Sequence, residues 1–375
     1  MIENIKIFYG SKKDFEKFVE DNINYYDDTI PFMDLIQHYN ARLRPSESGT
    51  SEEQLAQKIY VDNCIVRTDD YGSVLEHALA NFAGVVTLNH NIGTLFLQNP
   101  PKRVKASLEK YADSIDYHYS KYYNLERKSL KTIYQNLEND ILGQDNCKKQ
   151  IVSSLYRMAT KKNNKPVVLL LYGPSGVGKT ETAKSISKSF GGKLLRVQFS
   201  MMQTNEAYNY IFGAEHSKGS FARDMLERES NVILIDEFDK VNPLFYNAFY
   251  ELFDEGKFVD TNYEVDLKNA IILCTCNFLN IDEIIKALGP AMYSRIGCCI
   301  KFFDLSNEQK NQIVDNWYDS ILKTLNNQER VFVNSTNILK WFKENINRYD
   351  NIRILKTKLE NAIFNVLAEE FVLKK

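Results

Sequence analysis

The sequence has no long hydrophobic run and almost no excess of either charge. Its 375 residues include 47 Lys and Arg against 49 Asp and Glu, a formal net charge of −2. So small a charge creates no global field that attracts nucleic acid or anionic lipid, although it leaves room for a local basic patch. No apolar stretch approaches the roughly 20 residues of a membrane-spanning helix. The opening residues MIENIKIFYGSKKDF lack the apolar core of a secretory signal, so we expect a cytoplasmic protein with no membrane segment.

Cysteine and histidine are too few and too scattered to indicate a structural metal. There are six Cys and five His, with no CxxC pair and no histidine at ligand spacing. A structural zinc site normally needs four such ligands at short, defined spacing. The cysteines are therefore predicted to be reduced and to lie in strands as small buried apolar residues.

The first 125 residues contain no motif that we recognise, and the pattern up to residue 137 predicts two regions. Residues 1–100 mix helical stretches with a β-like segment at 84–101 and an exposed loop at 46–53. This mixture predicts a separate α+β domain, for which binding of a partner is the expected role. Apolar side chains then recur at helical spacing over 103–138, so residues 101–137 are predicted to form linker helices.

Between residues 138 and 305, short apolar strands alternate with helical stretches. The predicted strands are 167–172, 194–199, 232–236, 270–275 and 298–303. Continuous apolar strands that alternate with helices are typical of a five-stranded parallel sheet covered on both faces, which is an α/β fold. Only helical periodicity remains over 306–375, and it predicts a small C-terminal helical lid domain.

A glycine-rich segment, GPSGVGKT, follows the first of these strands and precedes a helix. This is the context in which G-x-x-x-x-G-K-[ST] binds phosphate, because backbone N–H groups and the helix N-terminus point at its oxygens. Lys179 is expected to contact the β- and γ-phosphates, and the Thr180 hydroxyl to ligate Mg²⁺. The predicted nucleotide-binding residues of this segment are Gly173, Pro174, Ser175, Gly176, Val177, Gly178, Lys179 and Thr180.

A second motif, NVILIDEFDK (231–240), is an apolar strand that ends in two acids. Open α/β sheets bind their ligands at the carboxyl ends of the strands, where this pair is expected to lie. We expect Asp236 to hold Mg²⁺, directly or through water, and Glu237 to polarise the attacking water.

These motifs, in this order, resemble the Clp-family AAA+ ATPases, and specifically the second ATPase module of the two-module Clp unfoldases. The resemblance extends from about residue 126 to the end of the sequence and implies the AAA+ P-loop NTPase fold. The segment LENDILGQDNCKKQI (137–151) is similar to the beginning of that module. By this resemblance, Ile141 and Leu142 would frame the adenine.

The resemblance also implies roles for three residues nearer the C-terminus. Asn277 matches the first polar sensor, which orients the water. Arg295, in MYSRIG, matches the arginine finger that reaches a neighbouring subunit's nucleotide. Arg353, in NIRILK, matches the second sensor on the lid. The resemblance further implies ATP hydrolysis with Mg²⁺ and a ring-shaped homo-oligomer, a hexamer, that handles proteins as chaperones do.

The sequence departs from that family in three respects. The family's substrate-gripping loop carries a glycine-aromatic-aliphatic-glycine motif, whereas AEHSKGSF (214–221) contains no aromatic before Phe221. Asn277 and Arg295 are only 18 positions apart, which leaves no room for the loop that docks a barrel protease. A single ATPase module is present, and the N-terminal region is unlike the family's helical-repeat domain.

Two functions are compatible with these features, and a third is disfavoured. The first is a ring ATPase that remodels a dedicated protein partner without a protease. The alternative is an ATP-controlled switch or scaffold, in a bacterial defence or regulatory complex, that recruits a partner through the N-terminal domain without threading. A nucleic-acid motor or loader is disfavoured because NPPKRVK (99–105) is the only basic cluster, and it is expected to be a solvated helix start.

Overall fold

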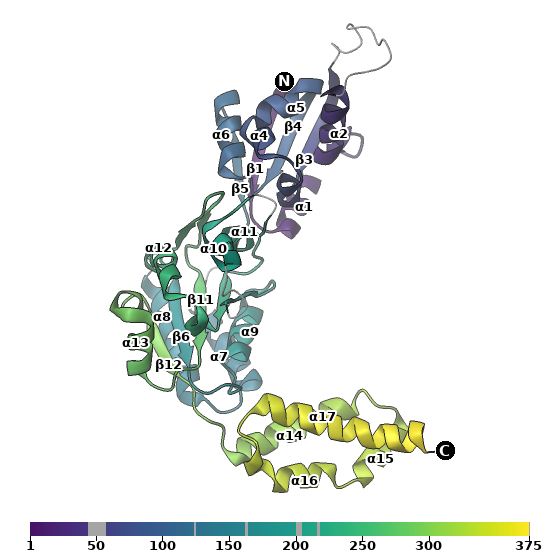
Figure 1. Ribbon diagram of the computed structural model, residues 1–375, viewed down its shortest axis with the longest axis vertical. Coiled ribbons are helices and arrows are strands. Elements are labelled where there is room, and N and C mark those ends of the chain that lie inside the picture. Colours follow the sequence, from purple (N-terminus) through teal and green to yellow (C-terminus); the bar gives the residue numbers. More distant parts are fainter. Residues whose placement is uncertain (44–57, 124, 162–163, 200–204, 216–217, 375) are drawn as a thin grey trace.

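The computed structural model describes residues 1–43, 58–123, 125–161, 164–199, 205–215 and 218–374. The predicted loop at 46–53 and the pair His216 and Ser217 lie outside these described residues. The chain forms an N-terminal unit (described residues of 1–119), a central unit (129–305) and a C-terminal unit (306–374). Figure 1 shows the three units following one another along the long axis of the molecule.

The N-terminal unit is built on a five-stranded sheet with the order β2-β3-β4-β1-β5, in which every neighbouring pair is parallel. Its strands are β1 (Ile2–Tyr9), β2 (Thr29–Pro31), β3 (Ile59–Val66), β4 (His90–Gln98) and β5 (Asp116–Tyr119). Its helices are α1 (Lys12–Glu20), α2 (Phe32–Leu43), η1 (Thr68–Ser73), α4 (Glu76–Ala80), α5 (Phe82–Asn89) and α6 (Lys102–Tyr111). Helix α1 packs on one face of the sheet, and α2, α4, α5 and α6 contribute to the core on the other.

This unit differs from the sequence-based expectation in three ways. It is α/β rather than α+β, because crossover segments with helices join the strands and allow parallel pairing throughout. The first third of segment 84–101 belongs to helix α5, in which Phe82, Val85 and Val86 recur at helical spacing and are buried. The helix expected over 103–138 is interrupted by β5, which pairs with the end of β1 and so belongs to this sheet.

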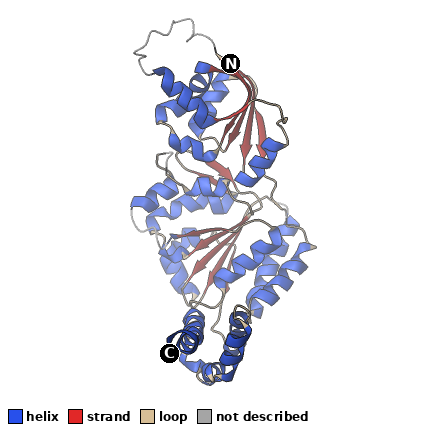
Figure 2. Ribbon diagram, turned by 90° about the vertical axis from the view of Figure 1, so that its right-hand side faces the viewer, coloured by secondary structure: helices blue, strands red, loops and turns tan. Residues whose placement is uncertain are grey.

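The central unit contains a second parallel sheet, with the order β12-β6-β11-β8-β7, which confirms the predicted five-stranded sheet. Its strands are β6 (Val167–Tyr172), β7 (Leu195–Gln198), β8 (Val232–Asp236), β11 (Ile271–Cys276) and β12 (Cys298–Lys301). Its helices are α7 (Ser129–Asp140), α8 (Asp145–Lys161), α9 (Lys179–Phe190), α10 (Asn205–Phe212), α11 (Phe221–Leu226), η3 (Phe238–Lys240), η4 (Pro243–Phe249), α12 (Tyr250–Glu255) and α13 (Ile281–Tyr293). Figure 2 shows helices on both sides of this sheet, and a separate hydrophobic core fills each side.

A short antiparallel hairpin, formed by β9 (Lys257–Val259) and β10 (Glu264–Asp266), joins the central unit to the N-terminal one. The Lys102 ammonium donates to the carbonyl of Asp260 at 2.6 Å, and the Lys102 backbone N–H donates to the carbonyl of Asn262 at 2.8 Å. Arg223 forms an ion pair with Asp69 nearby. The basic cluster at 99–105 does begin a helix, as expected, but Lys102 is a docking contact rather than a solvated side chain.

The C-terminal unit is helical, as predicted for a lid. It consists of α14 (Asn307–Leu322), α15 (Asn327–Ser335), α16 (Ile338–Glu344), η5 (Ile346–Arg348), α17 (Ile352–Ala368) and η6 (Glu369–Leu373). Helix α17 supplies the centre of its core through Leu355, Leu359 and Ile363, which are fully buried. Among the described residues of the whole chain, no helix is both long and apolar enough to cross a membrane.

All six cysteines are free. Five of them lie in strands, as predicted, but Cys147 lies on helix α8. Its thiol donates to the carbonyl of Lys301 at 2.8 Å, and burial raises its pKa to about 11. A thiol with so high a pKa stays protonated and unreactive at neutral pH.

Candidate nucleotide site

The glycine-rich segment forms a tight loop between β6 and α9. Gly173 has φ 134° and Gly178 has φ 104°, backbone conformations that side chains rarely allow. A Cβ on Gly173 would also collide with the carbonyl oxygen of Phe302. Because Gly178 is the N-cap of α9, the loop leads directly into the positive end of that helix. This backbone is suited to surround an anion such as a phosphate.

Lys179 lies inside this loop. Its ammonium donates to the carbonyls of Gly173 and Pro174, each at 2.6 Å, and to Oδ1 of Asn277 at 3.1 Å. Burial lowers its pKa below the usual value, an effect opposed by the nearby charge of Asp236. The structure therefore brings together the lysine and the asparagine that the sequence places 98 positions apart.

The acidic end of β8 lies beside the start of α9. The Thr180 hydroxyl is 3.4 and 3.5 Å from the two carboxylate oxygens of Asp236, which is itself buried. A hydroxyl and a carboxylate placed together are the oxygen ligands that Mg²⁺ accepts, and Mg²⁺ keeps water in its remaining positions. The donor set thus fits a magnesium ion held by Thr180 and Asp236.

Side chains from neighbouring strands orient this carboxylate. The Thr275 hydroxyl on β11 donates to Asp236, and the Arg196 guanidinium on β7 donates to it from Nε at 2.9 Å and Nη2 at 2.5 Å. Sequence reasoning missed both residues. The available signals were a threonine in the apolar run AIILCTC and an arginine in the first half of LLRVQF.

Glu237 directly follows the strand and has a left-handed backbone, with φ 55° and ψ 47°. Its N–H donates to the Thr275 hydroxyl at 2.9 Å, and its carboxylate accepts from Gln198 Nε2 at 3.1 Å. A non-glycine residue in this conformation costs energy, and such residues gather at functional sites. The Glu237 carboxylate thus lies beside Gln198, while Asp236 lies beside Thr180.

The segment expected to frame adenine lies next to the phosphate loop. Ile141 is buried, and its Cγ2 is 3.6 Å from the position of a Cβ on Gly178, whereas Leu142 is half-buried. Gln144 connects this segment to the chain entering the lid, since its side chain donates to the carbonyl of Phe303 at 2.7 Å and accepts from the N–H of Phe303 at 3.1 Å. An apolar wall therefore lies beside the phosphate loop, as a base requires.

The lid reaches the site through the start of α17. Asn351, the N-cap of this helix, has its side-chain oxygen 3.1 Å from the position of a Cβ on Gly176. Arg353 follows in the first turn and is exposed. Burial lowers the pKa of Lys179, and the positive charge of Arg353 adds a smaller effect in the same direction. A polyphosphate between them would neutralise both charges.

Comparison with known proteins agrees with this geometry. The family model described as AAA domain (Cdc48 subfamily) matches residues 164–328. The ClpA homolog protein of Fuscovulum blasticum is 30% identical over 182 residues, which are 46% of this chain and 23% of that protein. The chaperone protein ClpB of Malacoplasma penetrans is 23% identical over 278 residues, 68% of this chain and 39% of that protein. The solved S. cerevisiae Hsp104-ADP complex matches with a TM-score of 0.54 and 21% identity, and covers 67% of this chain and 49% of that one.

Residues 164–328 therefore match an AAA domain, and the central and lid units together resemble the AAA+ ATPase module of the Clp proteins. AAA+ modules of this type bind ATP with Mg²⁺, which agrees with the phosphate loop and the oxygen donors described above. The chain spans less than half the length of each relative named here.

Within this AAA+ module, Arg295 is the one predicted site residue that lies away from the others. Arg295 precedes β12 at the amino end of the parallel sheet. Two residues later, the N–H of Gly297 donates to the carbonyl of Val168, near the start of β6. Its guanidinium pairs with Asp254 at 2.8 Å and stacks over the ring of Tyr250 at 4.3 Å. The phosphate loop follows the other end of β6. Arg295 and its own chain's phosphate loop therefore lie at opposite ends of the strands.

By the resemblance, residues 214–221 match the family's substrate-gripping loop. Phe221 is fully buried, where its ring contacts Phe199 and Phe258. It begins α11 as a core residue. Glu215 and Lys218 are exposed, and the described part of 213–221 exposes no aromatic side chain.

Proposed function

We propose that this chain is an ATP-hydrolysing, Clp-like AAA+ protein that assembles into a cytoplasmic hexameric ring and remodels a dedicated protein partner. The single observation that carries hydrolysis is the convergence of Lys179, Thr180, Asp236 and Asn277 at one edge of the central sheet. In this proposal, residues 1–100 recognise the partner and 101–137 connect them to the module. The large subdomain extends over 138–305, and no barrel protease is involved.

Each residue of the site has a distinct role in this proposal. The phosphate loop and Lys179 bind the β- and γ-phosphates, and Thr180 and Asp236 hold the magnesium ion that neutralises their charge. Glu237 accepts a proton from the attacking water, and Asn277 orients that water. Arg353 reports the loss of the γ-phosphate to the lid, and Ile141 and Leu142 enclose the base.

Arg295 completes the site of a neighbouring subunit in this proposal. Its position at the amino edge of the sheet supports that role, because it is remote from its own chain's phosphate loop and partly exposed. A head-to-tail contact that repeats around a closed ring would place this edge against the next subunit's nucleotide.

The second candidate is an ATP-controlled switch that binds a partner without threading it. The observation that favours it is the exposed pair Glu215 and Lys218, where threading needs an aromatic ring. A ring wedges against any backbone because its apolar face is indifferent to sequence, whereas charged side chains recognise only matching partners. We therefore expect no processive unfolding of generic substrates.

A folded fluorescent reporter with an unstructured tail tests both candidates. Under conditions of measured ATP turnover, we expect its fluorescence to remain constant, since the chain would act only on its own partner. ATP-dependent loss of fluorescence would overturn the absence of threading. Purification of a Glu237→Gln chain, which should retain ATP, would then identify the partner by what copurifies with it.

A further inference from the structure

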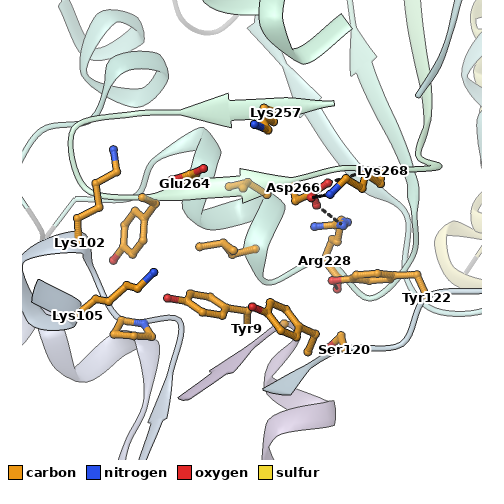
Figure 3. A pocket seen from close by; sticks show the side chains of 16 residues that line it. Tyr9, Lys102, Lys105, Ser120, Tyr122, Arg228, Lys257, Glu264, Asp266 and Lys268 are labelled. Carbon is orange, nitrogen blue, oxygen red and sulfur yellow. Dashed lines mark hydrogen bonds and ion pairs between the residues drawn. The ribbon is translucent and has the colours of Figure 1, made fainter. Parts of the chain in front are cut away.

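A cavity of about 630 Å³ lies between the N-terminal unit and the β9–β10 hairpin of the AAA+ module. Figure 3 shows the hairpin along one side and the N-terminal strands along the other. The N-terminal unit contributes the residues that end β1 and β5, among them Tyr9, Gly10, Tyr119 and Ser120. The volume lies within the usual range of small-molecule sites, about 300–1,000 Å³.

The cavity lies where ligands bind in open parallel sheets. Strands β1 and β4 are neighbours, but the helix after β1 packs on one face of the sheet and the helix after β4 packs on the other. This divergence opens a crevice at the carboxyl ends of the two strands. Gly10, directly after β1, and Pro100, shortly after β4, both line the cavity.

A buried arginine without a counter-ion lies at one end of this crevice. Arg228 is only 6% exposed, and its guanidinium donates to the carbonyl of Met225 at 2.6 Å, to Oδ1 of Asn231 at 3.2 Å and to the carbonyl of Asp266 at 3.2 Å. These acceptors are neutral, and within the described part of the chain no carboxylate forms an ion pair with Arg228. Burial lowers its pKa, an effect that the nearby charge of Asp266 opposes only in part. A buried charge that is hydrogen-bonded but not neutralised favours the binding of an anion.

The other charged residues of the lining strengthen this preference. Four lysines, Lys102, Lys105, Lys257 and Lys268, accompany Arg228, against two acids, Glu264 and Asp266. Lys268 pairs with Asp266 at 2.5 Å and Lys105 with Glu109 at 3.7 Å, whereas Lys102 donates to a neutral carbonyl. Figure 3 shows Lys102 and Lys105 at the end of the cavity opposite Arg228. The lining therefore carries a net positive charge in a chain whose overall charge is negative.

Tyrosine rings line the cavity between Arg228 at one end and Lys102 and Lys105 at the other (Figure 3). Tyr9 and Tyr119 stack with centroids 5.7 Å apart and planes at 24°, and Tyr119 remains 63% exposed. Tyr122 covers the Arg228 guanidinium at 4.1 Å. An exposed ring face beside cations is the arrangement on which proteins stack a planar base while holding its phosphate.

We propose that this cavity is a second nucleotide site, which binds a free nucleotide monophosphate with its base against Tyr119 and its phosphate among the cations. The same chemistry occurs in single-stranded nucleic acid. The bounded volume between two units of one chain favours the free nucleotide. The site is separate from the phosphate loop and does not depend on ATP hydrolysis. Because its walls come from both units, a bound nucleotide would bridge the N-terminal unit and the hairpin.

The test uses the full chain with Lys179→Ala, so that the phosphate loop contributes little to binding. Fluorescently labelled adenosine and guanosine monophosphates are titrated, with the labelled nucleosides and a labelled oligothymidylate of about ten nucleotides as comparison probes. We expect saturable binding of at least one monophosphate and weaker or no binding of its neutral nucleoside. In this background, failure of the second site cannot be mistaken for failure of ATP hydrolysis.

Two variants and two matched controls assign the binding to the cavity. Lys105→Gln and Tyr119→Leu should each weaken it about tenfold, the effect of one charge-assisted hydrogen bond or one stacking contact. Lys110→Gln on the same helix and Tyr25→Leu lie outside the lining and should leave it unchanged. The proposal is overturned by no saturable binding, by equal binding of the nucleoside, by binding of the oligonucleotide alone, or by no response to the two cavity variants.

Discussion

Arg295 provides the sharpest test of how the AAA+ module works, because it lies far from its own site. Strand β6 has six residues and separates the amino edge of the sheet from the phosphate loop. At about 3.3 Å per residue, the two edges are on the order of 20 Å apart. No arginine side chain spans that distance, so any direct contact of Arg295 with a nucleotide must be with the nucleotide of another subunit.

Two inactive variants should therefore restore activity when they are mixed. Arg295→Ala alone should lose about 10³–10⁵ in turnover, the usual contribution of an arginine finger. Lys179→Ala alone should not bind nucleotide productively. In an equal mixture, an interface is active when an Arg295→Ala chain supplies the phosphate loop and a Lys179→Ala chain supplies the finger. In a head-to-tail ring that assembles at random from this mixture, about one quarter of the interfaces are active.

The assay is phosphate release at constant total protein, with about one quarter of the unaltered rate expected for the equal mixture. A chain that carries both substitutions, mixed with Lys179→Ala, is the control and should stay inactive, because no subunit then has an intact phosphate loop. Arg295→Lys should not substitute for arginine, since it keeps the charge but loses the planar fork. Full activity of Arg295→Ala alone, or no recovery in mixtures that demonstrably co-assemble, would refute the role in trans.

Three further predictions concern the site, the core and pH. Glu237→Gln should bind ATP with affinity near that of the unaltered chain but stop phosphate release, and continued turnover would remove Glu237 from catalysis. Phe221→Ala should lower the free energy of unfolding by about 3–5 kcal/mol, because it empties a fully buried aromatic position, whereas Lys218→Ala should change it little; equal urea midpoints would contradict this packing. The Arg67 guanidinium holds the pKa of Glu16 below 4.5. This pair should therefore stabilise the chain above about pH 4.5 and lose its effect as the pH falls through the lowered pKa. Because both side chains are about one third exposed, Glu16→Gln should cost at most about 1 kcal/mol at pH 7, and a cost that stayed constant down to pH 3 would disprove the assignment.

The sequence predicts the central sheet and the phosphate loop well because both depend on local patterns. Continuous apolar runs identify β6, β8 and β11, and the residues that follow them share one edge as soon as the strands are parallel. That is why Lys179, Asp236 and Asn277 could be placed together. Arg196 and Thr275 were missed because their role depends on strand order. Both reach Asp236 only because β7 and β11 are the neighbours of β8, and no local pattern determines that order.

The N-terminal unit was harder to predict for a related reason. Short buried helices and strands have similar apolar content, so the run at 82–89 is compatible with both until its spacing is compared with a period of 3.6. Strand β5 has only four residues, and its Tyr119 also fits a helical spacing with Ile115 and Tyr122. The β9–β10 hairpin is shorter still, with three residues in each strand. Such elements are stabilised mainly by their partners in space, which the sequence does not identify.

The contact of Arg295 with Asp254 has a consequence for timing around the proposed ring. Asp254 and Tyr250 lie on α12, and the chain leads to that helix from Glu237 through η3 and η4. The segment from Glu237 to Glu255 therefore begins at the chain's own nucleotide site and ends in contact with Arg295, the finger proposed to reach the next subunit. A rigid movement of this segment at Glu237 would displace Arg295 as well. In the proposed ring, this segment would therefore couple the nucleotide state of one subunit to hydrolysis in the next.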